Sequence, residues 1–151
     1  MKKTMHETKP QEKITNYIIG GWFAYPSITL NPIVFWGRFK HSESLLRDGK
    51  IDGELLDKYG SSKIKGVMND RGLDFEKRYD DRKDFFEYNF EKRNGVWVGE
   101  YKNPMYDMIY PTTAFTGLID ENDFVTMGLK IGLKRDNKLL EEDYYLTPFS
   151  F

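Results

Sequence analysis

The sequence predicts an all-β protein, an antiparallel up-and-down β-barrel of about eight or more strands. From about residue 34 to residue 146, short segments alternate apolar and polar residues and are joined by tight turns. Aromatic residues make up 16% of the chain, and such residues are typical of pleated, half-buried surfaces. Several segments also carry a glycine near their middle, at Gly37, Gly53, Gly66, Gly99, Gly117 and Gly128. Because a glycine weakens a flat strand, its repetition indicates a sheet that coils tightly enough to close.

Length and composition favour one domain. A chain of 151 residues can bury one core, so we expect a single barrel domain over 14–151 after a flexible polar tail over 1–13. The 23 basic and 24 acidic residues are interspersed and give a formal net charge of -1, which disfavours a nucleic-acid partner. The absence of cysteine excludes a disulfide framework. No apolar segment follows Lys2-Lys3, so we expect a cytoplasmic protein.

The first part of the predicted domain contains a stretch without charge. No charged side chain occurs from Ile14 to Gly37, a length that could cross a bilayer. Gly20-Gly21, Pro26 and Pro32 would interrupt a membrane helix, however, so we expect no membrane association. The predicted structure is two or three buried extended segments, over 16–24, 27–30 and 33–40. The pattern also permits a short helix over 14–19.

A strong hairpin signal lies at Asn94-Gly95, which favours a type I′ turn. This turn sets Tyr88 opposite Tyr101, and Phe90 opposite Gly99. One face of the hairpin then carries Phe86, Tyr88, Phe90, Trp97, Gly99 and Tyr101, while most charged residues lie on the other. The register therefore separates a core face from a solvent face.

The two preceding hairpins extend the same apolar face. A turn over 69–72 with an even number of residues places Ile64, Gly66 and Met68 on one face with Leu73, Phe75, Lys77 and Tyr79. A four-residue loop over 58–61 adds Ile51, Gly53 and Leu55. Lys77 is the one charged residue on this predicted inner face.

Towards the C-terminus, the segments 113–120 and 123–132 resemble a hairpin about Glu121-Asn122 with two apolar faces. A strand buried on both faces needs an outer cover. We expect the uncharged N-terminal segment to pack there, on the outside of the barrel, with a homodimer interface as the alternative. A last strand is expected over 139–146, before Thr147-Pro148.

Four segments carry a resemblance to a known family. Gly-Lys-Ile-Asp-Gly-Glu-Leu-Leu-Asp at 49–57, Tyr-Gly-Ser-Ser-Lys-Ile-Lys-Gly at 59–66, Leu-Asp-Phe-Glu-Lys-Arg-Tyr at 73–79 and Val-Trp-Val-Gly-Glu-Tyr at 96–101 resemble small bacterial β-barrel proteins of the lipocalin-like, or calycin-like, type. The resemblance covers roughly residues 35–130. It implies a barrel that holds a small apolar or amphipathic ligand in its mouth, in a group whose short bacterial members often have no assigned activity. Unlike secreted lipocalins, this chain has no cysteine, and we expect no secretory signal.

Six residues are candidates for binding such a ligand. Lys77, on the inner face, either pairs inside the barrel and anchors a ligand, or lies near the rim and reaches water. Arg38 carries the same ambiguity, because it follows Trp36-Gly37. The aromatic candidates beside these cations are Tyr79, Tyr88, Trp97 and Tyr101, whose alternative role is core packing.

Signatures of catalysis and of metal binding are absent from the sequence. Two histidines cannot build a multi-histidine site, and His41 and Ser42 point to opposite sides of an extended chain. The acidic clusters at 80–81, 121–123 and 141–143 fall where turns and solvated faces are expected. We therefore predict no metal site, no catalytic residue and no cofactor.

Three functions follow, in order of preference. The first is an uncharacterised small-molecule-binding barrel with its ligand in the interior, which a cavity of several hundred Å³ would support. The second is a protein-interaction module or homodimeric structural domain without a ligand, which a packed interior and an exposed apolar patch would support. The third is a small-barrel enzyme using acid/base chemistry, which needs a carboxylate beside a tyrosine or lysine in a pocket.

Overall fold

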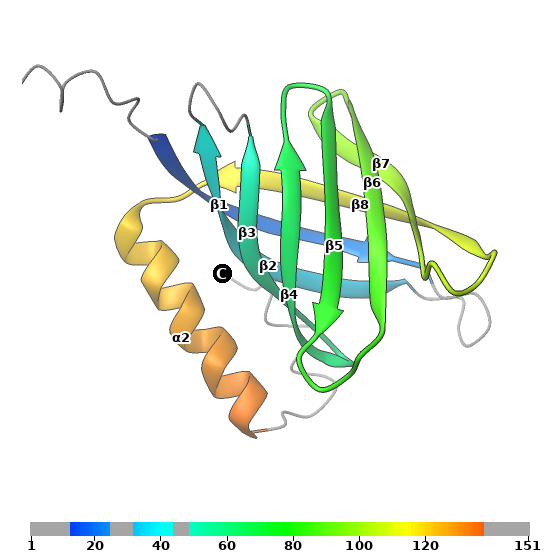
Figure 1. The fold of residues 1–151 in the computed structure, drawn as a ribbon. Helices are drawn as coiled ribbons and strands as arrows, with labels where there is room; N and C mark the ends of the chain where they lie inside the picture. The colour runs from blue at the N-terminus through cyan, green and yellow to red at the C-terminus, as the bar shows by residue number, and fades with distance from the viewer. Residues whose placement is uncertain (1–12, 25–31, 44–48, 138–151) are drawn as a thin grey trace, which may run out of the picture.

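The computed structural model describes residues 13–24, 32–43 and 49–137. Eight antiparallel strands form a closed barrel in chain order, and β8 pairs with β1 to complete it (Figure 1). The strands are β1 (Lys13–Phe23), β2 (Ile33–Glu43), β3 (Lys50–Asp57), β4 (Gly60–Met68), β5 (Gly72–Tyr79), β6 (Phe85–Arg93), β7 (Val96–Lys102) and β8 (Ile109–Leu118), followed by helix α2 (Glu121–Asn137). The predicted fold class, an up-and-down β-barrel, is confirmed.

The hairpin between β6 and β7 has the predicted register. Asn94 and Gly95 form its turn with φ values of 52° and 80°, the left-handed conformation that a type I′ turn requires. Tyr88 lies opposite Tyr101, and Phe90 lies opposite Gly99. The local turn chemistry therefore fixed which side chains enter the barrel.

The two preceding hairpins keep the predicted faces with one change in loop length. Between β4 and β5, Met68 pairs with Leu73 across a four-residue loop. Between β3 and β4, Asp57 pairs with Gly60, so the turn has two residues and not the four that the sequence suggested. This difference shifts the register by an even number, so Ile51 and Leu55 still point inward and are buried.

Glycines allow the strands to coil as closely as barrel closure requires. A Cβ added at Gly66 would lie 1.9 Å from the carbonyl oxygen of Asp74 and 2.6 Å from the Cα of Phe75. A Cβ at Gly99 would lie equally close to the carbonyl oxygen of Asn89, at 1.9 Å. No side chain fits such a gap, so the mid-strand glycines of β4 and β7 have the role that the sequence predicted for them.

The expected hairpin over 113–120 and 123–132 is wrong. Its first part belongs to β8, but its second part lies in α2. The helix begins where the Asp120 Oδ1 accepts a hydrogen bond from the backbone N–H of Asp123 at 2.8 Å. Its buried residues are Phe124, Met127 and Ile131, which share one helical face. The apolar residues of 123–132 that suggested a strand therefore belong to an amphipathic helix.

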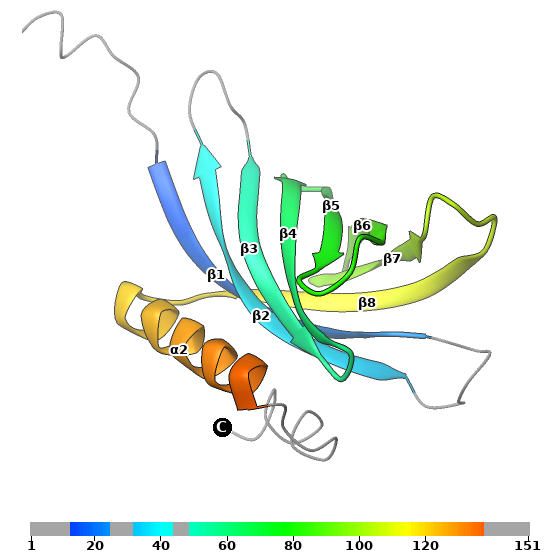
Figure 2. The same cartoon turned by 60° about the horizontal axis from the view of Figure 1, so that its bottom comes forward.

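The uncharged N-terminal segment does not pack on the outside of the barrel, which corrects a second expectation. It forms β1 and β2, which are part of the wall, and no short helix occurs over 14–19. The outer cover is α2, which lies against the β1 and β2 side of the barrel (Figures 1 and 2). Strand β2 is apolar on both faces because Phe35 enters the interior and Trp36 lies under the helix. The expected segments 27–30 and 139–146 lie outside the described residues.

Two buried apolar clusters result, one on each side of the wall. The larger fills the barrel interior with inward residues from all eight strands, including Ile19, Phe39, Leu55, Ile64, Phe75, Phe90, Trp97 and Ala114. The smaller lies between the wall and α2 and consists of Trp36, Leu56, Met127 and Ile131. Within the described part of the chain, no helix has both the length and the apolar character needed to cross a membrane.

Candidate ligand-binding pocket

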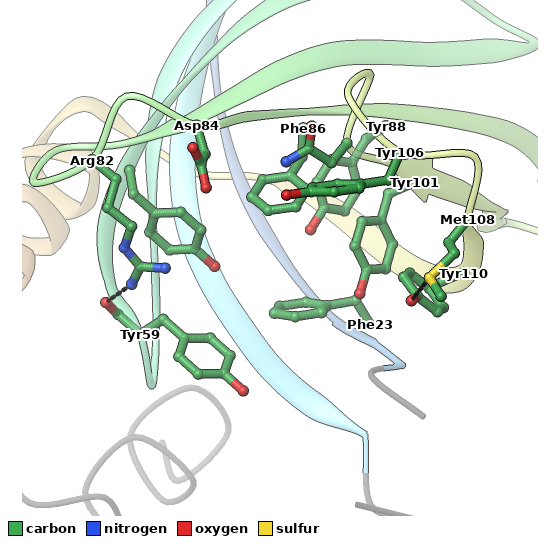
Figure 3. Close-up of a pocket in the computed structure, with 12 residues that line it drawn as sticks. Phe23, Tyr59, Arg82, Asp84, Phe86, Tyr88, Tyr101, Tyr106, Met108 and Tyr110 are labelled. Carbon is green, nitrogen blue, oxygen red and sulfur yellow. Dashed lines mark hydrogen bonds between the residues drawn. The ribbon is translucent and has the colours of Figure 1, made fainter. Parts of the chain in front are cut away.

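A pocket of about 620 Å³ opens at one mouth of the barrel (Figure 3). Most of its twelve lining residues are aromatic, namely Phe23, Tyr59, Tyr79, Phe86, Tyr88, Tyr101, Tyr106 and Tyr110. The other four are Arg82, Asp84, Asn103 and Met108. The pocket therefore has apolar walls with a few polar groups, the usual composition of a small-molecule site.

The up-and-down topology brings these residues together. Carboxyl ends of the odd-numbered strands meet at this mouth, so Phe23, Tyr79 and Tyr101 approach one another from β1, β5 and β7. Tyr59 comes from the turn after β3, and Phe86 from the start of β6. Residues distant in the sequence thus converge because each lies at or near the same end of its strand.

Beneath the pocket lies a buried ion pair. The Lys77 ammonium donates a hydrogen bond to the Asp57 Oδ2 at 2.6 Å and another to the Tyr79 hydroxyl at 3.0 Å. The Tyr79 hydroxyl in turn donates to the same Asp57 oxygen at 2.8 Å. Asp57 and Lys77 are both 0% exposed. Their charges are compensated by each other, as burial of charge requires.

The ion pair is tied to the rim of the pocket through the β3–β4 turn. The second carboxylate oxygen of Asp57, Oδ1, accepts a hydrogen bond from the backbone N–H of Tyr59 at 2.8 Å. The Arg82 guanidinium donates to the backbone carbonyl of Tyr59 at 2.9 Å, a bond drawn in Figure 3. Both oxygens of the buried carboxylate are therefore used, and the turn that carries Tyr59 is held from both sides.

Two cations lie over the rings of the pocket. The Lys77 Nζ lies 4.7 Å from the ring centroid of Phe23, 4.6 Å from that of Tyr79 and 5.5 Å from that of Tyr88. The Arg82 guanidinium carbon lies 4.5 Å from the Tyr79 centroid and 5.9 Å from the Tyr59 centroid. These distances fall within the range of cation–π attraction, so the protein's own cations engage the aromatic wall.

A row of rings crosses four neighbouring strands along the wall, from β5 to β8. Tyr88 stacks on Phe75 with centroids 5.0 Å apart and on Tyr101 with centroids 4.9 Å apart. Tyr110 continues the row, tilted against Tyr101 at 5.5 Å. Each contact joins residues directly opposite each other in the strand register. The wall is therefore preformed, because cross-strand packing fixes each ring.

Burial shifts the protonation equilibria at the pocket floor. Loss of water lowers the pKa of Lys77, and the neighbouring Asp57 carboxylate acts against that effect. Burial raises the pKa of Tyr79 well above its usual value, and the charge of Asp57 raises it further. The pKa of Tyr88 is raised well above its usual value for the same two reasons. Both phenols therefore remain protonated at neutral pH.

Several hydroxyl groups of the pocket are engaged within the protein. Tyr101 donates to the backbone carbonyl of Ala24 at 2.5 Å, and Tyr110 contacts the Met108 sulfur at 2.8 Å. With Tyr79 bound to Asp57, three of the lining phenols donate their protons to protein atoms. The charged side chains on the lining are at the exposed rim, on Arg82 and Asp84.

The structure brings four of the six candidate residues together. Tyr79, Tyr88 and Tyr101 line the pocket, and Lys77 lies directly beneath two of them. The alternative in which Lys77 reaches water at the rim is wrong, because its side chain is fully buried against Asp57. Whether these residues bind a ligand stays a prediction.

The other two candidates lie elsewhere. Trp97 is buried in the interior and donates from its indole Nε1 to the Thr116 hydroxyl at 3.1 Å, away from the pocket lining. Arg38 points outward, because successive side chains of a strand lie on opposite faces and its neighbour Phe39 points into the barrel. Its guanidinium binds Glu54 at 2.8 Å and lies 4.2 Å from the ring centroid of Phe124 in α2. Arg38 therefore fastens the helix and does not reach the pocket.

The sequence did not identify Asp57 as the partner of Lys77, nor most of the residues at the pocket opening. The alternation that places Ile51, Gly53 and Leu55 inside continues to Asp57, so this residue could have been found as the partner of Lys77. Phe23 could have been found from the strand ends, given the topology. Arg82, Asp84, Asn103, Tyr106 and Met108 lie in connections, where no alternation constrains the direction of a side chain.

The buried ion pair contains groups that acid/base catalysis uses, but most of them do not line the pocket. Asp57 lies within hydrogen-bond reach of Lys77 and Tyr79, the arrangement that acid/base catalysis needs. Of these three groups, however, only Tyr79 lines the pocket, and its proton is already donated to Asp57. Among the described residues, no three histidine, cysteine or acidic side chains are grouped to hold a metal ion.

Comparisons with known proteins give this chain no relative. No protein-family model, curated protein or solved structure matches it.

Proposed function

We propose that the protein binds a small apolar or amphipathic molecule in the mouth of its barrel. The observation that carries the proposal is the preformed pocket of about 620 Å³, with mostly aromatic walls, above a neutralised ion pair. This volume lies within the range of small-molecule sites, roughly 300–1,000 Å³. The resemblance of 49–66 and 96–101 to lipocalin-like barrels supports the same function, since such barrels commonly hold ligands at this place.

The proposal is tested with the fluorescent probe N-phenyl-1-naphthylamine, an uncharged aromatic molecule that emits more strongly in apolar surroundings. We expect saturable binding with one site per chain. Met108→Trp adds bulk to a lining residue and should weaken binding at least about fivefold, roughly 1 kcal/mol. Met105→Trp is the matched control, since Met105 is 81% exposed and does not line the pocket. Equal binding by both variants would place the probe elsewhere.

A second candidate function rests on the outer surface. Val96, Val98 and Phe115 are between 37% and 44% exposed on the neighbouring strands β7 and β8, and Leu129 of α2 is 66% exposed. Such residues favour contact with a second copy of the chain. Native mass spectrometry of protein from its own host reports bound ligand and subunit number together. A monomer that carries a small molecule supports the pocket, and a dimer without one supports the second candidate.

A further inference from the structure

The rings of the pocket have an unusual relation to charge. An aromatic pocket ordinarily attracts organic cations, because the face of each ring is electron-rich. Here a cation of the protein already lies close to several of these rings. The Lys77 ammonium lies within 5.5 Å of the ring centroids of Phe23, Tyr79 and Tyr88, all of which line the pocket. The protein thus sets a cation of its own against three rings of the pocket wall.

The second cation acts in the same sense from the rim. Arg82 lies over Tyr79 at 4.5 Å and over Tyr59 at 5.9 Å, so Tyr79 contacts two positive charges. Both cations have partners within the protein. Lys77 is held by Asp57 at 2.6 Å, and Arg82 is held by the Tyr59 carbonyl at 2.9 Å. A ligand cation would compete with these two protein cations for contact with the rings.

Negative charge near the pocket does not reverse this balance. The Asp57 carboxylate is bound by Lys77, Tyr79 and the backbone of Tyr59. Asp81, whose Oδ1 lies 3.4 Å from the Arg82 Nε, and Asp84 are both exposed, so solvent and salt weaken their attraction for a cation. What the walls offer a ligand is therefore ring stacking and apolar contact.

We propose that the pocket selects an uncharged aromatic ligand and discriminates against organic cations, because Lys77 and Arg82 already make cation–π contacts with its rings. This inference rests on the proposed ligand-binding function. It adds the chemical class of the ligand and assigns Lys77 and Arg82 as residues that determine specificity.

The test uses two ligands of matched shape that differ in charge, 2-tert-butylnaphthalene and N,N,N-trimethyl-2-naphthylammonium. Each competes with N-phenyl-1-naphthylamine, and the measured quantity is the ratio of the two affinities. A neutral molecule enters any apolar cavity more readily, so the wild-type ratio alone decides nothing. The decisive quantity is the change of this ratio when the internal cation is removed.

The double variant Asp57→Asn/Lys77→Met removes the buried ion pair and leaves the rings in place. We expect the ratio to move about tenfold in favour of the cation, the scale of one cation–π contact. The matched control, Glu76→Gln/Arg78→Met, removes an ion pair of the same 2.6 Å length from the outer face of β5. A folded inner variant whose ratio stays within twofold of this control would overturn the inference.

A second variant tests the charge selectivity if the Asp57→Asn/Lys77→Met variant does not fold. Arg82→Met acts on an exposed rim residue, and we expect a smaller shift, about threefold towards the cation, that weakens at high salt. Arg93→Met, on the outer side of the distant β6–β7 hairpin, is its control. Failure of the fluorescent probe to bind wild-type protein would refute the proposed function itself. Probe binding with unchanged ratios would refute only the charge selectivity.

Discussion

The inner and outer faces of the barrel wall each have an ion pair beside an apolar cluster, Lys77–Asp57 inside and Arg38–Glu54 outside, and these two pairs differ in burial and in what they hold. Inside, Lys77 and Asp57 have side chains that are 1% and 0% exposed. Outside, Arg38 and Glu54 remain 21% and 15% exposed beneath the edge of α2. The inner pair has lost nearly all its water, so its two charges depend on each other far more strongly than those of the outer pair.

The difference shows that the face of the strand on which a cation lies decides what the cation contacts. Arg38 and Lys77 are both cations on strands of the barrel wall, and each has an aromatic residue close by in the sequence. Arg38 points outward and fastens a helix, while Lys77 points inward and supports a pocket. One residue of displacement along a strand therefore separates a structural contact from a candidate binding determinant.

The largest effect is expected from breaking the inner pair on one side only. Lys77→Met leaves the Asp57 carboxylate buried without its ion partner and should lower the free energy of unfolding by about 3–5 kcal/mol. Asp57→Asn/Lys77→Met should recover most of this loss, because no uncompensated charge remains. Urea unfolding followed by tryptophan fluorescence measures both. A loss below about 1 kcal/mol for the single variant would mean that the two faces do not differ as described.

A smaller effect is expected in the outer cluster. Ile131→Ala truncates a fully buried residue of α2 and should lower the free energy of unfolding by about 2–4 kcal/mol. Leu133→Ala, on the same helix, removes a side chain that is 62% exposed and should cost less than about 0.5 kcal/mol. Equal costs for the two variants would show that α2 does not contribute its buried face to a common core.

The smallest effect concerns alkaline pH. The pKa of Tyr88 is raised in the folded state, mainly by burial, so above pH 10 the unfolded chain loses a phenol proton that the folded chain retains. Stability therefore falls as pH rises in this window, by up to about 1.4 kcal/mol per pH unit for one such tyrosine. The lowered pKa of Lys77 acts with the opposite sign, raising stability as pH approaches 10.5 from below.

Tyr88→Phe tests this slope. The variant should lose less stability than the wild-type protein between pH 10.5 and 11.5 in urea unfolding experiments. Tyr106→Phe is the matched control, since its hydroxyl belongs to a residue that is 66% exposed. An unchanged slope in Tyr88→Phe would contradict the assignment of Tyr88 to the dry interior.

Local sequence signals predicted the part of the fold that depends on neighbouring residues. Asn94-Gly95 fixed a register, and the alternation on either side of it placed Tyr88, Trp97 and Tyr101 inside the barrel. The same logic failed at Phe124, Met127 and Ile131, where apolar residues on both strand faces concealed a helical repeat and the capping signal of Asp120. Short apolar runs do not distinguish a strand from a helix by periodicity alone.

The sequence by itself therefore determined the barrel, the inward direction of Lys77 and the aromatic character of the wall, because side-chain alternation and turn chemistry are local properties of the chain. Only the tertiary structure decided that Asp57 is the partner of Lys77, that α2 covers Trp36, and that the rim residues Tyr59 and Arg82 meet at one mouth. These contacts depend on strand ends and connections converging through closure of the sheet, and closure acts between residues that no local pattern relates.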